Sequence, residues 1–245
     1  MAKEIPKLKI VLIGYGKMGK AIEEVAISRG HEILFIIDAH NREQLQPEIL
    51  KRADAAIEFT GPDSAVENLK ICFDAQTPVV CGSTGWLKNW KEVKNHCEMQ
   101  NGALLCASNF SIGVNIFFEI NKKLALLMGS HPEYNVTIEE IHHTQKKDAP
   151  SGTAITLAEQ VIHNNPTKKD WVTQAPSSRE QLQIISKRID PAPGTHIVNY
   201  QSPIDDITLT HTAHNRQGFA LGAVLAAEFI AGKSGIFNMK DVLGL

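Results

Sequence analysis

The first hundred residues alternate short apolar runs with longer segments in which apolar residues recur at helical spacing. The runs are rich in β-branched residues and lack polar alternation, as expected for strands that are buried on both faces of a sheet. This pattern predicts an α/β fold, a doubly wound parallel sheet with helices on both faces. The predicted strands are 9–14, 32–38, 55–59, 78–82 and 103–107, and the predicted helices are 17–29, 64–75 and 87–100.

A different pattern follows the fifth predicted strand. An apolar helical segment, 115–128, precedes a strand-like segment, 134–145, and another helix is predicted from Ser151. Later segments alternate polar and apolar residues, which predicts a mixed or antiparallel sheet with one covered face: 180–189, 195–201 and 206–212. These strands could also pair between subunits, so we expect an α+β domain with an oligomerising sheet.

The last apolar segment, 218–232, is rich in small residues, which suits a helix that packs closely against a sheet. We expect this helix to return to the first sheet. The sequence therefore predicts two domains. The first is formed by residues 1–107 and completed by 216–245, and the second is formed by 108–215.

Composition narrows the class of protein. A chain of 245 residues with 43% hydrophobic residues can bury a large core. Its 25 basic and 27 acidic residues leave a net charge of -2, which provides no positive field for nucleic acid. Residues 1–10 lack the apolar core of a signal peptide, and no later stretch is apolar for long enough to cross a bilayer. We therefore expect a cytoplasmic protein without a membrane or nucleic-acid partner.

The cysteines show neither a CxxC pair nor a metal-ligand spacing. Thiols stay reduced in the cytoplasm, so all four are interpreted as core or near-surface residues: Cys72, Cys81, Cys97 and Cys106. No metal site is predicted.

A glycine-rich turn directly follows the first predicted strand and opens a helical pattern. Gly14 permits a tight turn, Gly16 lets the backbone approach a pyrophosphate, and Gly19 allows close helix packing. Asp38 ends the next strand, where an acid can accept hydrogen bonds from an adenosine ribose. An ordinary glycine turn is the alternative. The position of the motif favours a Rossmann-like dinucleotide site that comprises Gly14, Tyr15, Gly16, Lys17, Met18, Gly19 and Asp38.

The same acid bears on the choice of cofactor. The Asp38 carboxylate repels a 2′-phosphate, and Ala39 and His40 do not supply the arginine that would bind one. NADH is therefore favoured. Arg42 is close enough in sequence to reach the site, so NADPH remains possible.

Two further loops end strands of the predicted sheet. Thr60 follows one strand, and Gly82, Ser83 and Thr84 follow the next. In open parallel sheets ligands bind at the carboxyl ends of the strands, where small and hydroxylated residues suit a ribose and a nicotinamide. Ordinary turn chemistry is the alternative interpretation.

The segment 139–154 holds the densest group of candidate catalytic residues. His142, His143 and Lys146 can carry protons and positive charge. Just downstream, Ser151 and Thr153 stand at the start of an apolar helix, whose N-terminus suits a carboxylate. Paired histidines or a capped helix are often structural when they occur alone. Their joint occurrence in a chain with a dinucleotide motif indicates an active site.

Within this segment, EIHHTQKKDAPSGTA resembles the signature of 4-hydroxy-tetrahydrodipicolinate reductases. The similarity continues along nearly the whole chain, in GYGKMG, FTGP, GSTGW, ASNFSIGVN, HTAHNRQGFALGA and SGIFNMKDVL. One position departs from the family, since Thr137 stands where the signature usually opens with a glutamate. This position lies upstream of the proposed proton-transfer residues and leaves their assignment largely untouched.

The resemblance implies a homotetrameric enzyme of lysine and diaminopimelate synthesis, in which NADH or NADPH reduces a small dicarboxylate, 4-hydroxy-tetrahydrodipicolinate, to tetrahydrodipicolinate. The first domain would bind the dinucleotide, and the second would bind the substrate and form the tetramer. His142 matches the proton donor and acceptor, and Lys146 matches a second proton donor. Substrate-binding positions are His143, Gly152 and Thr153, next to Ser151, and positions near the nicotinamide are Ala107, Ser108, Asn109 and Phe110.

Two other functions share part of this pattern. An amino-acid dehydrogenase that acts on aspartate or diaminopimelate would also have the glycine turn and an acid at the position of Asp38. The segment HHTQKKDAPSGT argues against such an enzyme. A regulatory protein that senses NADH without chemistry would need only the first domain and an interaction surface. Such a regulator would have little use for paired histidines and Lys146.

Overall fold

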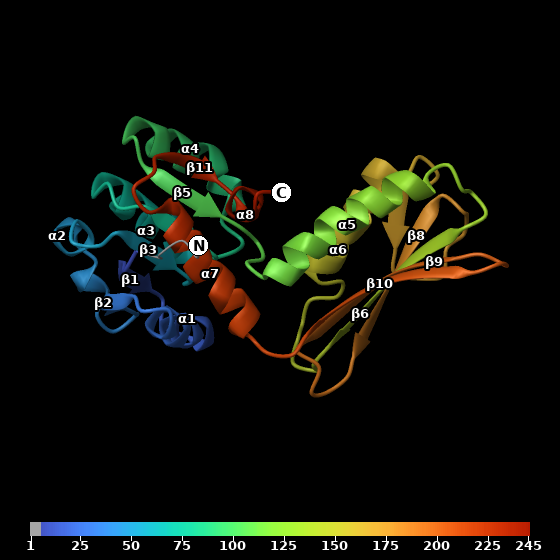
Figure 1. Cartoon of the computed structure of the whole chain (residues 1–245), viewed down its shortest axis with the longest axis horizontal. Coiled ribbons are helices and arrows are strands. Elements are labelled where there is room, and N and C mark those ends of the chain that lie inside the picture. The colour runs from blue at the N-terminus through green and yellow to red at the C-terminus, as the bar shows by residue number, and fades with distance from the viewer. Residues whose placement is uncertain (1–5) are drawn as a thin grey trace. The chain divides into compact units, whose positions relative to one another are not determined.

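The computed structural model describes residues 6–245, so the first five residues of the N-terminal segment considered above lie outside the described residues. Its contacts divide the chain into two compact units. The first runs to Ile112 and resumes over Arg216–Leu245, and the second is Gly113–Asn215. Each unit has its own sheet (Figure 1) and its own hydrophobic core.

The first unit is built on a six-stranded parallel sheet with the strand order β11-β5-β4-β3-β1-β2. The predicted parallel α/β sheet is therefore confirmed. The sequence pattern missed one strand, β11, which is a three-residue strand at the edge of the sheet. The strands are β1 (Lys9–Ile13), β2 (Glu32–Ile37), β3 (Ala55–Glu58), β4 (Val79–Cys81), β5 (Ala103–Cys106) and β11 (Gly235–Phe237).

Helices cover both faces of this sheet. Alternate residues of β1 show the division: Ile10 and Leu12 pack toward α1 and α7, whereas Val11 and Ile13 pack toward α3 and α4. The helix predicted over 87–100 begins with a short 3-10 turn. The helices are α1 (Lys17–Ser28), α2 (Pro47–Leu50), α3 (Pro62–Asp74), α4 (Trp90–Met99), α7 (Gln217–Ile230) and α8 (Met239–Leu243), with 3-10 turns η1 (Arg42–Gln44) and η2 (Leu87–Asn89).

Helix α7 lies on the sheet of the first unit, against α1 and strands β3, β4 and β5. Small residues make this close approach possible. A Cβ atom at Gly222 would lie 1.7 Å from the backbone oxygen of Phe110, so a larger residue would force the backbone to move. The C-terminal segment thus completes the core of the first unit.

The second unit carries a five-stranded sheet with the order β10-β9-β6-β8-β7. Strand β6 pairs parallel with β8 and antiparallel with β9, so the sheet is mixed, as predicted. The three-residue strand β7 was missed by the sequence pattern. The elements are α5 (Ile112–Met128), β6 (Asn135–His142), α6 (Gly152–Asn164), β7 (Asp170–Val172), β8 (Gln181–Arg188), β9 (Gly194–Gln201) and β10 (Asp206–Ala213).

Helices α5 and α6 share one core with this sheet. On β6, Val136 and Ile138 belong to that core, and the alternation of side chains continues the same face to Glu140 and His142. Both polar residues are therefore buried with the apolar ones. Within residues 6–245, no helix has the length and apolar character needed to cross a membrane.

Candidate active site

Strand register gathers a group of polar residues in the second unit. Glu140 on β6 stands opposite His196 on β9, and His142 stands opposite Arg188 on β8. Ser151, the residue before α6, contacts the same group. We call Glu140, His142, Ser151, Arg188 and His196 the Glu140 cluster.

The Glu140 carboxylate is the centre of the cluster. Its side chain is fully buried, and both oxygens accept a hydrogen bond from the backbone N–H of Ser151, each at 3.1 Å. The Nη2 atom of Arg188 donates to Oε1 at 3.1 Å. Burial alone would raise the pKa of Glu140, but hydrogen bonds from His142 and Ser151 bring that pKa well below its usual range. Glu140 thus carries a buried negative charge that is paired with Arg188.

Two histidines meet beside this carboxylate. The Nε2 atoms of His142 and His196 are 3.4 Å apart, and the rings lie edge to face. The Nε2 atom of His196 also lies 3.2 Å from the Oγ atom of Ser151. Burial, aided by the neighbouring His142 imidazole, lowers the pKa of His196 to about 4, so the His196 imidazole is neutral at neutral pH. His196 is therefore not suited to deliver a proton at neutral pH, which leaves His142 as the catalytic candidate of the pair.

The N-terminus of α6 adjoins the cluster. Ser151 is the N-cap, and its Oγ atom accepts a hydrogen bond from the N–H of Ala154 at 3.2 Å. At Gly152 an added Cβ atom would meet no heavy atom within 4 Å, so a ligand can approach the backbone there. Thr153 follows in the first turn and is partly buried. The helix start is thus arranged to bind an anion such as a carboxylate.

Lys146 and His143 occupy the loop that joins β6 to α6. The Nζ atom of Lys146 lies 2.8 Å from each oxygen of Asp148, and this hydrogen bond lowers the pKa of Asp148. Arg188 donates to the backbone oxygens of Lys146 and Asp148 and so ties the loop to the Glu140 cluster. The Nδ1 atom of His143 is buried without a hydrogen-bond partner in the described part of the chain.

Gly194 provides the space for the catalytic candidate. A Cβ atom at this position would lie 3.0 Å from Cε1 and 3.2 Å from Nδ1 of His142. We expect Gly194→Ala to displace the imidazole, to lower the free energy of unfolding by about 1–3 kcal/mol, and to reduce turnover. Denaturant unfolding and steady-state kinetics measure both effects. Gly218→Ala is the matched control, because its Cβ atom would meet only Ser111, at 3.9 Å; equal losses in the two variants would contradict the steric argument.

In the first unit, the turn between β1 and α1 has the shape that a dinucleotide requires. Gly14 has a φ of +100°, and its Cβ atom would lie 2.3 Å from the backbone oxygen of Phe59. A Cβ atom at Gly19 would lie 2.3 Å from the Gly14 oxygen, whereas one at Gly16 would meet nothing within 4 Å. Gly14 and Gly19 thus serve close packing, and Gly16 leaves the start of α1 open to a pyrophosphate. The flanking residues of this turn are Tyr15, Lys17 and Met18.

Asp38, the acid that would accept hydrogen bonds from the ribose, directly follows β2. One Asp38 oxygen accepts a hydrogen bond from the backbone N–H of His40 at 2.7 Å. Arg42, the residue that could admit a 2′-phosphate, is bound elsewhere: it donates to Asn68 Oδ1 at 2.6 Å and to Glu67 Oε2 at 2.7 Å. With these partners Arg42 does not point to a 2′-phosphate site, so its position does not favour NADPH as the cofactor.

The other predicted cofactor loops meet at the carboxyl edge of the first sheet. The N–H of Thr60 donates to the Oγ atom of Ser83 at 2.8 Å, and the rings of Phe59 and Phe110 are 5.5 Å apart. A Cβ atom at Gly82 would strike the Phe59 ring at 2.1 Å. Loops that follow β3, β4 and β5 are thus packed together, and they carry the exposed or partly buried Thr84, Ala107, Ser108 and Asn109.

Sequence reasoning missed three members of the Glu140 cluster: Glu140, Arg188 and His196. Each lies on a strand with alternating polar and apolar residues, on or beside the covered face. A charged or imidazole side chain at a position where the alternation requires an apolar residue is a signal that could have drawn attention to Glu140 and His196.

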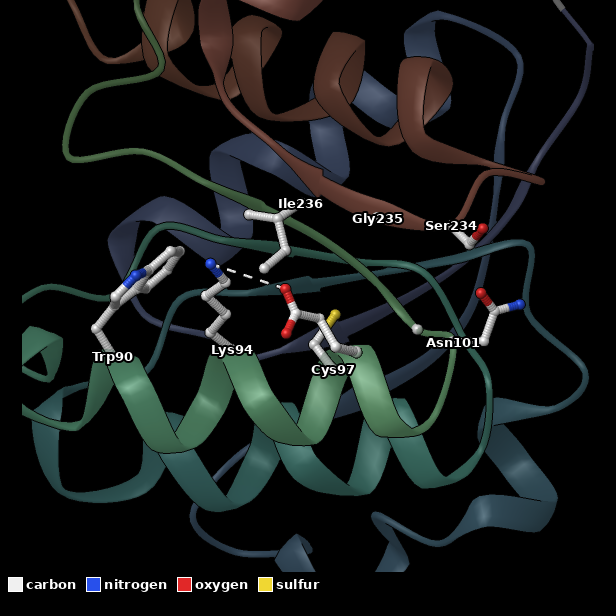
Figure 2. Close-up of a pocket in the computed structure, with 9 residues that line it drawn as sticks. Trp90, Lys94, Cys97, Asn101, Ser234, Gly235 and Ile236 are labelled. Atoms are coloured by element: carbon white, nitrogen blue, oxygen red, sulfur yellow. Dashed lines mark ion pairs between the residues drawn. The ribbon is translucent and has the colours of Figure 1, made fainter.

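A separate hollow of about 390 Å³ lies between α4 and β11 in the first unit. Figure 2 shows that Trp90, Lys94 and Cys97 of α4 face Ile236 of β11. Lys94 pairs with Glu98 along the helix, at 3.8 Å. None of the predicted site residues lines this hollow, so it plays no part in the candidate site.

Comparison with known proteins covers both units. Residues 8–110 match the family model of the dihydrodipicolinate reductase N-terminus, and residues 113–243 match that of its C-terminus. The chain is 48% identical over 238 residues to a 4-hydroxy-tetrahydrodipicolinate reductase from Christiangramia forsetii, which covers 96% of this chain and 98% of the relative. A reductase of the same name from Methanocaldococcus jannaschii is 35% identical over 241 residues, which covers 96% of this chain and 81% of the relative.

The fold is also similar to that of a solved structure. A dihydrodipicolinate reductase from Paenisporosarcina sp. TG-14, with dipicolinate bound, superposes with a TM-score of 0.75 at 21% identity, covering 96% of this chain and 99% of the other. The family models, the relatives and the shared architecture agree along the chain. The protein belongs to the dihydrodipicolinate reductase family.

Proposed function

We propose that this protein reduces 4-hydroxy-tetrahydrodipicolinate to tetrahydrodipicolinate with a nicotinamide cofactor, as a cytoplasmic step of lysine and diaminopimelate synthesis. The relative that is 48% identical to this chain is named for this activity, and the similarity covers nearly the whole length of both proteins. The dipicolinate bound to the Paenisporosarcina enzyme is a cyclic dicarboxylate, which supports the proposed class of substrate. Neither an amino-acid dehydrogenase nor an NADH-sensing regulator accounts for these relationships.

The observation that carries the proposal is the link between His142 and the start of α6. Glu140 accepts hydrogen bonds from the backbone of Ser151 and lies 3.5 Å from the Nε2 atom of His142. One buried carboxylate therefore fixes a proton-carrying imidazole next to an anion-binding helix end. We propose that a substrate carboxylate binds at the backbone of Gly152 and at Thr153, with His143 nearby.

The proton chemistry is assigned to two residues. The bound nicotinamide supplies a hydride. Loss of the 4-hydroxyl group of the substrate as water would leave a conjugated imine. Hydride addition to that imine builds negative charge, which an adjacent acid must neutralise. His142 delivers that proton, and Lys146 serves as a second donor when substrate draws its ammonium away from Asp148, its partner at 2.8 Å. The cationic side chains also orient the two carboxylates of the substrate.

The test is oxidation of NADH and NADPH in the presence of the condensation product of pyruvate and aspartate semialdehyde. The proposed function predicts turnover that requires this substrate. If the pure protein oxidised neither cofactor under these conditions, the proposed function would be wrong.

The Asp38 carboxylate makes NADH the favoured cofactor. We expect Asp38→Ala to weaken NADH binding more than NADPH binding, because the change removes both a ribose acceptor and a charge that repels a 2′-phosphate. Fluorescence titration of each cofactor measures the ratio of dissociation constants. Equal losses for the two cofactors would show that Asp38 does not contact the ribose.

We propose a homotetramer assembled through the sheet of the second unit. Strand β10 is the edge of that sheet, and an edge strand offers unpaired backbone groups to another chain. Apolar side chains near it are exposed, with Ile204 at 84% and Ile207 at 37%. One chain has a mass of 27.0 kDa, and sedimentation equilibrium should give four times that mass. A protein that sediments as a monomer at working concentrations would contradict this assembly.

A further inference from the structure

The Glu140 cluster brings three metal-ligating atoms around one point. The Nε2 atoms of His142 and His196 are 3.4 Å apart, and they lie 3.5 Å and 3.8 Å from the Oε2 atom of Glu140. The hydrogen bond between His142 and Glu140 is therefore long, and the separation of His196 from Glu140 exceeds hydrogen-bond range. All three side chains are buried and come from the paired strands β6 and β9, so their spacing is set by the sheet.

The spacing suits a tetrahedral transition-metal ion. Zinc bonds to imidazole nitrogen and carboxylate oxygen at 2.0–2.2 Å, which places neighbouring ligand atoms roughly 3.3–3.6 Å apart. Two of the three separations lie in this range, and the 3.8 Å between His196 and Glu140 must close slightly when the ion binds. The rings of His142 and His196 lie at 70° with centroids 5.1 Å apart, so they meet at an angle, as two imidazoles on one ion do. Two imidazoles and one carboxylate form a frequent protein ligand set for zinc, with a fourth position left to water.

The surroundings of Glu140 keep one oxygen directed at this point. Arg188 binds Oε1 at 3.1 Å, whereas Oε2 is the oxygen that faces both imidazoles. Outer hydrogen bonds of this kind hold a ligating carboxylate in place. The positive charge of Arg188 opposes a dication, which favours a reversible site over a permanently loaded one.

We propose that Glu140, His142 and His196 form a binding site for Zn²⁺ or Co²⁺, and that occupation of this site inhibits the enzyme. The inhibition rests on the proposed function, because the ion would occupy the Nε2 atom of His142 and so remove its proton-transfer role. The binding itself does not depend on that function. Release of the ion by a chelator restores the imidazole and with it the activity.

Titration of the full-length protein with Co²⁺ tests the binding. We expect the visible absorption of four-coordinate cobalt, one ion per chain, and displacement of cobalt by zinc. Loss of a ligand in His196→Asn should weaken affinity by at least the 10- to 100-fold that loss of an outer hydrogen-bond partner causes. His131→Ala, a change at an exposed histidine outside the cluster, should leave the affinity unchanged.

Three results would overturn the site: unchanged cobalt affinity in His196→Asn, equal weakening in His131→Ala, or charge-transfer bands typical of cysteine ligands. His196→Gln replaces the asparagine variant if circular dichroism shows that the latter is unfolded. The absorption spectrum of the parent protein tests the ligand set without any variant.

Inhibition is measured separately. We expect Zn²⁺ to abolish turnover at the concentration that displaces cobalt, and a chelator to restore it. Full activity with the site occupied would overturn the inhibitory role. A protein that binds cobalt as described but never turns over the substrate would contradict the proposed function and leave the metal site standing.

Discussion

His142→Gln should lower the turnover number by about a hundredfold to ten-thousandfold, the usual effect of removing a general acid. Glutamine retains a polar side chain of similar reach but cannot carry a proton between solvent and substrate. Because His142 lies on β6 of the second unit and the glycine turn lies in the first, cofactor affinity should change little. Steady-state kinetics and a separate NADH titration measure the two quantities.

His143→Gln is the matched control for this change. His143 follows His142 directly but lies beyond the end of β6, where its Nδ1 atom has no partner in the described residues. As a substrate-binding residue it should affect the Michaelis constant more than turnover. If His142→Gln turned over at the parent rate while His143→Gln lost the activity, the proton-donor role would pass to His143.

Glu140→Gln should lower the free energy of unfolding by about 3–5 kcal/mol, the usual cost of breaking a buried ion pair. The Glu140 side chain is fully buried, and its loss of charge leaves the Arg188 guanidinium, 21% exposed, without its carboxylate partner. The amide of glutamine has one acceptor oxygen in place of two, so the backbone N–H of Ser151 loses one of its two acceptors. Denaturant unfolding measures the difference.

Glu139→Gln provides the matched control on the same strand. Glu139 points to the opposite face of β6 and pairs at 2.8 Å with Lys187, which is 47% exposed. An ion pair of this kind contributes about 0–1 kcal/mol, so this variant should be close to the parent protein. Similar losses in Glu139→Gln and Glu140→Gln would show that burial of the pair is not what stabilises the sheet.

The sequence predicts the main elements because their patterns are local. The buried strands of the first sheet appear as apolar runs, and the strands of the second sheet appear as alternating segments. Strands β7 and β11 escape prediction because each is a short strand at the edge of a sheet. The equally short β4 is central and fully buried, so it appears as an apolar run. Short edge strands depend on a neighbour that is distant in sequence, and no local pattern records it.

The residues of the candidate site also divide into those that a local motif identifies and those that only the folded sheet brings together. His142 and Ser151 are close in sequence and stand out as a motif, whereas His196 and Arg188 join them only through the register of β6 with β9 and β8. Register is a property of the folded sheet. The departure at Thr137 lies outside the Glu140 cluster, because Thr137 is on the face of β6 opposite to Glu140 and His142.

Transfer of deuterium from the cofactor to the substrate tests the central claim most directly. NADH that carries deuterium at both positions of C4 is incubated with the protein and the condensation product of pyruvate and aspartate semialdehyde, and the product is analysed by mass spectrometry. The proposed function predicts tetrahydrodipicolinate with one deuterium, formed by the parent protein and barely formed by His142→Gln. Product without deuterium, or oxidation of NADH without a reduced product, would contradict it.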